Sequence, residues 1–248
     1  MIQVAGYSII GDRDSQQDSM RYEQKNGVLL ASVCDGMGGM QGGELASRQA
    51  IETIFREAVY LPSERGIPDW LRNTFIKADA DVCRLTGPGG EYLNCGTTVV
   101  SAVLVENRIY WGSVGDSKIY FFNKGQLRSI TRMHNYNLKL DEMVRNGTIS
   151  QEERIRESHR GEALISFLGL GELPLIDVNT EPLVMESGDM LILCSDGLYK
   201  SLDEQQVQAI VEESGENVQI ASKRLCEEAL RLAVSKQDNT TVIAISCQ

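Results

Sequence analysis

Short runs of apolar residues, most of them bounded by glycine, asparagine or charged residues, recur along the chain. This pattern is typical of β-strands in a layered core. Two-residue connections such as Glu106-Asn107 predict that several neighbouring strands form antiparallel hairpins. The predicted strands cover residues 3–10, 27–34, 97–106, 108–114, 118–123, 126–131, 190–194 and 240–245.

Other segments place apolar residues three or four positions apart, which predicts amphipathic helices. The expected helices cover residues 44–58, 69–85, 203–213 and 218–234, with shorter pieces at 138–145 and 151–157. Strands and helices come in blocks instead of alternating strictly, so the predicted fold class is α+β. No linker, repeat or low-complexity segment divides the chain, and we expect one domain over residues 1–248. The polar stretch at about 133–163 interrupts the strand pattern and is predicted to be a flap-like insert.

Composition narrows the class of protein. The sequence is 42% hydrophobic and 24% charged, which is ordinary for a soluble globular protein. No apolar run approaches the roughly 20 residues needed to cross a bilayer, and the first residues do not resemble a leader, so we expect a cytoplasmic protein without membrane contact. The net charge of −11 argues against nucleic acid as a partner. Six cysteines without a C-x-x-C pair fit a reducing cytosol.

Five aspartates lie at or beside the ends of predicted strands, each next to a glycine or another small polar residue. They are Asp18, Asp35, Asp116, Asp196 and Asp238. Any one of them, taken alone, is equally typical of a turn. Carboxylates that converge repel one another unless a cation neutralises them, and oxygen ligands suit Mg²⁺ or Mn²⁺. With only two histidines in the chain, a metal site would depend on such oxygen ligands.

Six segments resemble, in order, the signature motifs of bacterial metal-dependent type 2C (PPM) Ser/Thr protein phosphatases. They are residues 11–18 (GDRDSQQD), 33–39 (VCDGMGG), 96–98 (GTT), 114–117 (VGDS), 193–198 (LCSDGL) and 237–241 (QDNTT). The resemblance extends over essentially the whole chain. It implies a four-layer α/β/β/α sandwich in which two central antiparallel sheets are flanked by helix pairs, with metal ions at one end.

The resemblance also implies roles for individual residues. Asp35 corresponds to the carboxylate that bridges two metal ions, and the Gly36 carbonyl to a ligand of the second ion. Asp196 and Asp238 would complete the first site. Asp18 would serve the second ion directly or through water.

Two further roles follow from the same resemblance. Asp116, together with Asp196, corresponds to a weaker third metal site. Arg13 corresponds to the arginine that binds the substrate phosphate, a task suited to a guanidinium fork. The alternative for Arg13 is a surface side chain paired with Asp12 or Asp14.

The activity implied is hydrolysis of phosphoserine and phosphothreonine on proteins by a water activated between two Mn²⁺ or Mg²⁺ ions. The substrates would be proteins phosphorylated by a cognate Ser/Thr kinase, and a monomer is expected. Two alternatives stay open: a catalytically silent phosphoprotein-binding module on the same fold, and a phosphoesterase for small molecules. Retention of all the metal aspartates favours an enzyme.

Several positions depart from the family pattern or stay open. Gln17 stands where many bacterial members carry a glutamate, which predicts weaker binding of the second metal. Met37 and Met40 stand where relatives can carry a histidine as a general acid. His134 is a possible substitute, although a lone histidine in a polar segment is more often solvated. Asn239 is expected either to orient Asp238 or a metal-bound water, or to cap a turn.

Overall fold

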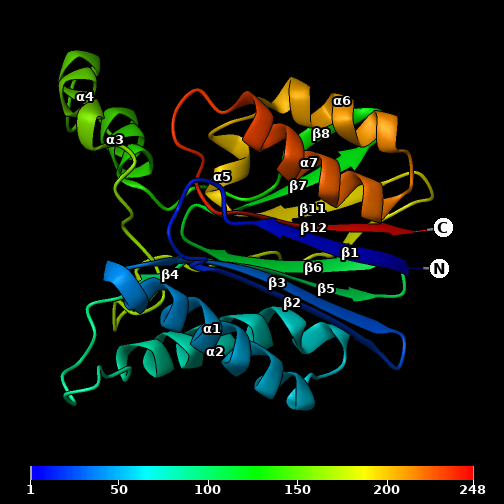
Figure 1. Cartoon of the computed structure of the whole chain (residues 1–248), viewed down its shortest axis with the longest axis horizontal. Helices are drawn as coiled ribbons and strands as arrows, with labels where there is room; N and C mark the ends of the chain where they lie inside the picture. Colours follow the sequence, from blue (N-terminus) through cyan, green and yellow to red (C-terminus); the bar gives the residue numbers. More distant parts are fainter. Residues whose placement is uncertain (1, 248) are drawn as a thin grey trace.

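Two antiparallel β-sheets lie face to face in the computed structural model, with a pair of helices on the outer face of each (Figure 1). The structure describes residues 2–247, apart from the side chains of residues 39–41. One sheet has the order β1-β12-β11-β7-β8, and the other has the order β10-β6-β5-β3-β2 with β4 and β9 added at β3 and β6. This arrangement confirms the predicted α+β sandwich.

The first sheet is formed by β1 (Ile2–Ile9), β7 (Lys118–Asn123), β8 (Gln126–Ser129), β11 (Met190–Cys194) and β12 (Thr240–Cys247). The second is formed by β2 (Asp18–Lys25), β3 (Val28–Met37), β4 (Gly96–Thr97), β5 (Val99–Val105), β6 (Arg108–Val114), β9 (Asp177–Val178) and β10 (Leu183–Val184). Strands β1 and β12 pair from Ile2 with Cys247 to Ile9 with Thr240. The two described ends of the chain therefore lie together, and the loops after Ile9 and before Thr240 lie at the opposite end of the sandwich.

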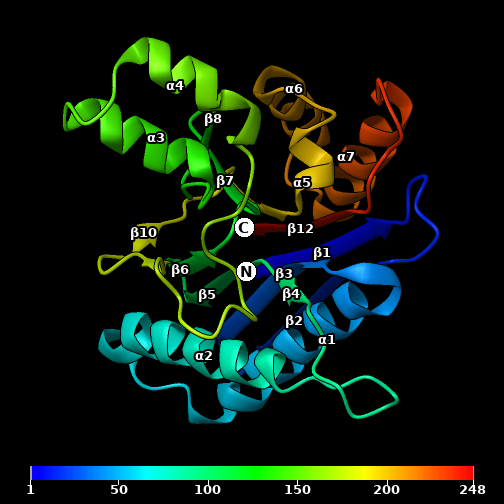
Figure 2. The ribbon, with the colours of Figure 1, turned by 90° about the vertical axis from the view of Figure 1, so that its left-hand side faces the viewer.

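Helices α1 (Gly39–Glu57) and α2 (Ile67–Cys83) cover the second sheet, and α6 (Glu204–Ser214) and α7 (Val218–Leu232) cover the first (Figure 1). Shorter helices are α3 (Tyr136–Arg145), α4 (Gln151–Glu157) and α5 (Asp196–Tyr199). Single 3₁₀ turns occupy Ala58–Tyr60, Glu64–Gly66 and Ser158–Arg160. Figure 2 looks onto the end opposite the chain ends, where α3 and α4 stand apart from the four layers. Among the described residues, no helix is long and apolar enough to cross a membrane.

The period-two alternation of the strands builds three apolar layers. In β3, Ala31 and Val33 point between the sheets, whereas Leu30 and Cys34 pack against α1 and α2. Strand β12 behaves in the same way, with Ile243 directed inward and its neighbours directed toward the outer helices. Strands buried on both faces have no polar face to display, which is why they read as continuous apolar runs in the sequence.

Several elements differ from the sequence prediction, among them the two-residue strands β4, β9 and β10, which were not predicted. Strand β2 was not predicted, because it is an edge strand whose outer half is exposed and polar. Helix α1 begins at Gly39, five residues before the predicted start, and thus includes the glycines at 39, 42 and 43. Close packing explains these glycines: a β-carbon on Gly36 would lie 2.0 Å from the Gly43 carbonyl oxygen, and one on Gly42 would lie 2.9 Å from the Cys95 β-carbon. Helix α5 was also not predicted.

Candidate metal centre

The aspartates of the sequence motifs come from five separate segments at the end of the sandwich that carries the loops after Ile9 and before Thr240. Asp18 opens β2 and is the cross-strand partner of Asp35 on β3. Asp116 lies in the turn between β6 and β7, immediately after Gly115, whose φ of 103° suits glycine. Asp196 follows the buried strand β11 as the first residue of α5, and Asp238 lies two residues before β12.

Hydroxyl and backbone hydrogen bonds fix the backbone around Asp35. Its carbonyl oxygen accepts bonds from the Thr97 hydroxyl at 2.8 Å and the Thr98 backbone N–H at 2.9 Å. The Thr98 hydroxyl oxygen accepts a bond from the Asp35 N–H at 3.1 Å. The next N–H, from Gly36, donates to the Gln17 carbonyl at 3.1 Å. Residues of the second motif are thereby tied to the first and third motifs.

Asp18 is the most deeply placed carboxylate of the five, with 7% of its surface exposed. Its Oδ2 accepts a hydrogen bond from the Ser195 hydroxyl at 2.7 Å, but its buried Oδ1 has no partner. Burial raises the pKa of Asp18 to about 7, and the charges of Asp196 and Asp238 act in the same direction. An unpartnered buried carboxylate oxygen is costly and is the kind of group that a cation satisfies.

The electrostatics of the neighbouring carboxylates point the same way. Burial, reinforced by the charges of Asp18, Asp196 and Asp116 and by a hydrogen bond shared with the Asp196 carboxyl, raises the pKa of Asp35 well above its usual range. Burial and then the Asp196 charge raise the pKa of Asp116 to about 6. Several carboxylates this close together favour either protonation or a bound cation.

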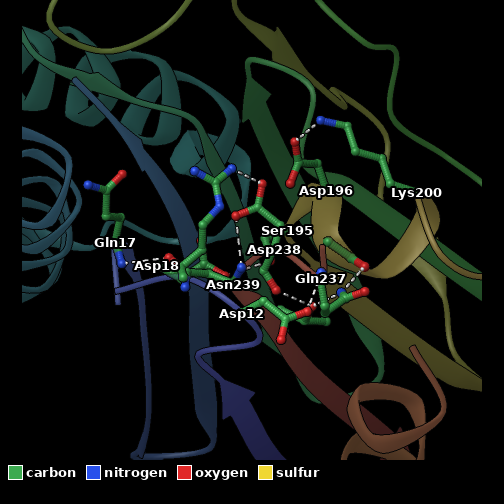
Figure 3. A network of polar contacts seen from close by, with 12 residues as sticks. Asp12, Gln17, Asp18, Ser195, Asp196, Lys200, Gln237, Asp238 and Asn239 are labelled. Atoms are coloured by element: carbon green, nitrogen blue, oxygen red, sulfur yellow. Dashed lines mark hydrogen bonds and ion pairs between the residues drawn. The ribbon is translucent and has the colours of Figure 1, made fainter. Parts of the chain in front are cut away.

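The donor set fits a divalent metal, although the side chains do not already surround one. Among residues 2–247, no three Asp, Glu, His or Cys side chains stand in a metal-binding arrangement. Two carboxylates instead pair with cations of the chain itself, Asp238 with Arg13 and Asp196 with Lys200 (Figure 3). The aspartate oxygens, the Gly36 carbonyl and the orphaned Asp18 Oδ1 are hard oxygen donors, as Mg²⁺ and Mn²⁺ require.

Arg13 faces the aspartates instead of its sequence neighbours. Its Nη2 donates to Asp238 Oδ2 at 2.6 Å, across 225 positions of sequence. The alternative pairing with Asp12 or Asp14 is therefore wrong for this structure. The Asp12 carboxylate accepts the backbone N–H of Gln237 at 2.8 Å. The ion pair with Asp238 places the Arg13 guanidinium beside the carboxylate cluster, with 58% of the Arg13 side chain exposed.

Asn239 has a role that the sequence did not indicate. Its side-chain amide donates to the carbonyls of Ile10 at 2.8 Å and Ser15 at 3.1 Å, and its Oδ1 accepts the Gln17 N–H at 2.8 Å. Asn239 thus fastens the loop that carries Arg13 to the start of β12, instead of capping a turn (Figure 3). An asparagine can make these bonds because its amide has both donors and an acceptor.

Gln237 and Ser195 are two further residues that sequence reasoning missed. The Gln237 amide donates to the Gly197 carbonyl at 2.9 Å and the Thr240 hydroxyl at 2.6 Å, which links the loop before β12 to α5. Ser195 accepts the Thr241 N–H at 2.9 Å while donating to Asp18. Their only signal in the sequence was their position next to the motif aspartates.

A cavity of 1130 Å³ opens beside these groups. Its walls are Arg13, Asp14, Ser15, Gln17, Asp35, Gly36, Met37, Gly38, Asp196, Lys200, Asp238 and Asn239. It combines a carboxylate cluster with two basic side chains, Arg13 and Lys200. Such a combination can hold cations at the carboxylates and an anionic group at the basic side chains.

Comparison with known proteins identifies the family. The family model for Protein phosphatase 2C matches residues 5–234. The chain belongs to the protein phosphatase 2C family. The serine/threonine phosphatase stp of Listeria monocytogenes is 27% identical over 233 residues, which cover 90% of this chain and 86% of that protein.

Solved structures of other phosphatases share the fold. The serine/threonine phosphatase of S. agalactiae superimposes with a TM-score of 0.84 at 22% identity, and all of both chains is covered. The catalytic domain of the protein phosphatase PstP, solved in complex with two manganese ions, gives a TM-score of 0.77 at 24% identity over 99% of this chain and 97% of that chain. The four-layer sandwich is thus the 2C phosphatase fold.

The 2C family pattern makes the residues that depart from it informative. Gln17, which was expected to weaken the second metal position, lines the cavity, and its Oε1 would lie 2.8 Å from a β-carbon added at Gly43. Met37 also lines the cavity, whereas the side chain of Met40 lies outside the described residues.

His134 is wholly buried, so the expectation of a solvated histidine was wrong. Its Nδ1 accepts the Gly115 N–H at 3.2 Å, and its Nε2 lies 3.2 Å from Asp177 Oδ2, without hydrogen-bond alignment. It is not among the residues that line the cavity. Its surroundings indicate a structural part in holding the turn before Asp116.

Lys200 is the second cation of this 2C phosphatase site. It follows α5, and its Nζ donates to Asp196 Oδ2. Burial lowers the pKa of Lys200, but the carboxylates of Asp196, Asp116 and Glu162 outweigh that effect and raise it. Lys200 was not singled out from the sequence, although its spacing of four residues from Asp196 is the signal for a helical ion pair.

Proposed function

We propose that this protein serine/threonine phosphatase hydrolyses phosphoserine and phosphothreonine on proteins with divalent metal ions held by its aspartates. The observation that carries the proposal is the cluster of carboxylates at the cavity. Asp35, Asp196 and Asp238 line it, the charges of Asp18 and Asp116 act on Asp35, and Asp18 Oδ1 is buried and unpartnered. Names of relatives such as the Listeria phosphatase stp support the substrate class. The manganese-bound PstP structure supports the metal.

The proposed ligand set contains six residues. Two Mn²⁺ or Mg²⁺ ions would be held by Asp18, Asp35, the Gly36 carbonyl, Asp196 and Asp238, and Asp116 with Asp196 correspond to the third, weaker position of the family, where Lys200 lies against Asp196. Asp35 would contribute to holding both ions, as the family resemblance implies, and the charges of Asp18, Asp196 and Asp116 already act on it. Bound there, the ions would supply Lewis-acid activation of water and charge neutralisation.

The chain's own residues would bind and orient the phosphate. Arg13 is exposed, lines the cavity and has a fork of donors suited to two phosphoryl oxygens. Its ion pair with Asp238 keeps the guanidinium at the cavity, and Asn239 holds the loop that carries it. Bound this way, the phosphate would face the carboxylate wall, with its ester oxygen directed toward the open side where a peptide would lie.

The remaining proposals concern the whole chain. We propose one catalytic domain over residues 1–248, with residues 133–163 as a flap-like insert that contains α3 and α4. We also propose that the protein acts as a monomer in the cytoplasm, on substrates of a Ser/Thr kinase. The six cysteines are all free, and four of them are buried, which supports a reducing compartment.

The test is hydrolysis by purified protein that has been stripped with EDTA. Para-nitrophenyl phosphate and a phosphothreonine peptide are assayed without metal and then with Mn²⁺ or Mg²⁺ restored. Metal-dependent turnover of both compounds is expected. A folded protein that binds the phosphopeptide but turns over neither compound is a binding module, and one that turns over only the aryl phosphate is a small-molecule phosphoesterase.

A further inference from the structure

The ammonium of Lys200 lies against one corner of the carboxylate cluster, where its Nζ donates to Asp196 Oδ2 (Figure 3). The local helix produces this contact. Asp196 is the first residue of α5 and Lys200 directly follows the helix, so the two side chains lie one turn apart on the same face. The Lys200 backbone N–H also donates to the Asp196 carbonyl at 3.0 Å, which fixes the turn. The Asp196 carboxylate is only 14% exposed.

The same short helix also holds Asp116, the other carboxylate of this corner. The Tyr199 hydroxyl donates to the Asp116 carbonyl at 3.1 Å, and the Lys118 ammonium lies 4.2 Å from the Tyr199 ring centroid. Asp116 and Asp196 therefore belong to a structured corner formed by α5 and the turn between β6 and β7. Lys200 borders this corner, with 46% of its side chain exposed.

The opposite corner of the cluster is different. There Asp18 receives hydrogen bonds only from neutral groups, and its Oδ1 has no partner within the described structure. An external cation is needed at Asp18, whereas the Asp116 and Asp196 corner already has one within the chain. A divalent ion bound by Asp116 and Asp196 would lie a few ångströms from the Lys200 ammonium. The repulsion between the two cations is strong where the site is partly buried.

We propose that Lys200 is the built-in counter-ion of the Asp116 and Asp196 corner and competes there with a divalent metal ion. Lys200 thereby limits how many ions the cluster holds, and the third, weaker position is closed or strongly weakened in this chain. The inference rests on the proposed function, because it assumes that the same aspartates bind the catalytic metals.

The test measures metal binding without any substrate. EDTA-stripped wild-type protein and the variants Lys200→Gln and Lys200→Arg are titrated with Mn²⁺ alone in a calorimeter. Lys200→Gln is expected to bind one more Mn²⁺ per chain, or to bind its weakest Mn²⁺ at least about tenfold more tightly. Lys200→Arg keeps the positive charge and is expected to match the wild type.

Lys223→Gln is the matched control. Lys223 forms an i,i+4 ion pair with Glu227 at 3.6 Å on α7, so its substitution removes the same charge and the same kind of pair on a helix away from the cluster. It is expected to bind Mn²⁺ as the wild type does. Any general effect of removing one positive charge from this acidic protein would appear in both glutamine variants.

The possible outcomes separate the two proposals. Extra or tighter Mn²⁺ binding in Lys200→Gln alone supports the counter-ion role. The counter-ion role is overturned if the isotherms of Lys200→Gln match those of Lys223→Gln, or if Lys200→Gln binds Mn²⁺ more weakly than the wild type. This conclusion holds whatever the enzyme hydrolyses. A wild-type protein that binds Mn²⁺ but releases no phosphate overturns the proposed function instead and leaves the comparison of isotherms valid.

Discussion

At the scale of single residues, the carboxylates that are proposed to bind metal lower the stability of the metal-free protein. Asp35 lies among Asp18, Asp116 and Asp196, so its negative charge is unfavourable when no metal is bound. We expect Asp35→Asn to raise the free energy of unfolding in EDTA at pH 7 by about 1–2 kcal/mol, because it removes that repulsion. The same substitution is expected to abolish metal-dependent hydrolysis. Urea unfolding and the phosphatase assay, run on one preparation, measure both effects, and a destabilised variant would contradict this account of the cluster.

Arg13 allows a second residue-scale prediction, in which binding is separated from turnover. Its side chain is more than half exposed, so its ion pair with Asp238 contributes little to stability. Arg13→Ala is expected to raise KM for a phosphothreonine peptide by roughly tenfold or more with a smaller change in kcat. Arg13→Lys is expected to recover only part of the loss, since an ammonium lacks the bidentate fork. An unchanged KM would assign Arg13 to the surface.

At the scale of elements, the base of the segment that carries α3 and α4 depends on polar contacts around Asp177 on β9. Arg132 donates two bonds to this carboxylate, at 2.6 and 2.8 Å, and the Nε2 of the buried His134 lies 3.2 Å from its Oδ2. Burial alone would raise the pKa of Asp177, but Arg132 and His134 outweigh burial and hold this pKa well below its usual range. The Asp177 carboxylate therefore contributes stability above its unfolded pKa of about 3.9, and this contribution is lost as the pH falls below that value.

Asp177→Asn tests these contacts. At pH 7 the substitution is expected to lower the free energy of unfolding by about 1–3 kcal/mol. The difference from the wild type should begin to shrink below about pH 5, because the Asp177 carboxylate of the unfolded chain then becomes protonated while that of the folded protein stays ionised. Denaturant unfolding at a series of pH values measures it. Glu227→Gln, on an exposed pair of α7, serves as the control and should show little difference at any of these pH values.

The elements that could be predicted from sequence are those whose burial leaves a periodic apolar pattern. Strands β3 and β12 are buried on both faces, and α7 has one apolar stripe, so each was predicted to within a few residues. Strand β2 gave no such pattern because its pairing with β3 comes from backbone hydrogen bonds, while most of its side chains face solvent. The burial of His134 was not predictable either, because it depends on Gly115 and Asp177, which come from other strands.

At the scale of the whole molecule, the site is assembled from both sheets and from nearly the full length of the chain. Motif resemblance was sufficient to indicate which aspartates to bring together. It did not indicate which cations lie beside them, because the contact of Arg13 with Asp238 spans 225 positions of sequence. Local motifs record residue types at strand ends, whereas ion pairs between distant loops depend on how the two sheets are stacked.

Because the cluster exists only in the folded chain, metal binding must appear as added stability of the whole domain. Mn²⁺ at about 100 times its dissociation constant should add about 2.7 kcal/mol, which corresponds to a rise in Tm of roughly 5–10 °C for a domain of this size. Differential scanning fluorimetry of the EDTA-stripped protein measures the rise. Asp18→Asn removes the negative charge of the carboxylate whose Oδ1 is unpartnered. This variant should therefore lose most of the rise in Tm. A rise of equal size in Asp18→Asn would place the stabilising ions elsewhere on this acidic protein, where a net charge of −11 also attracts cations.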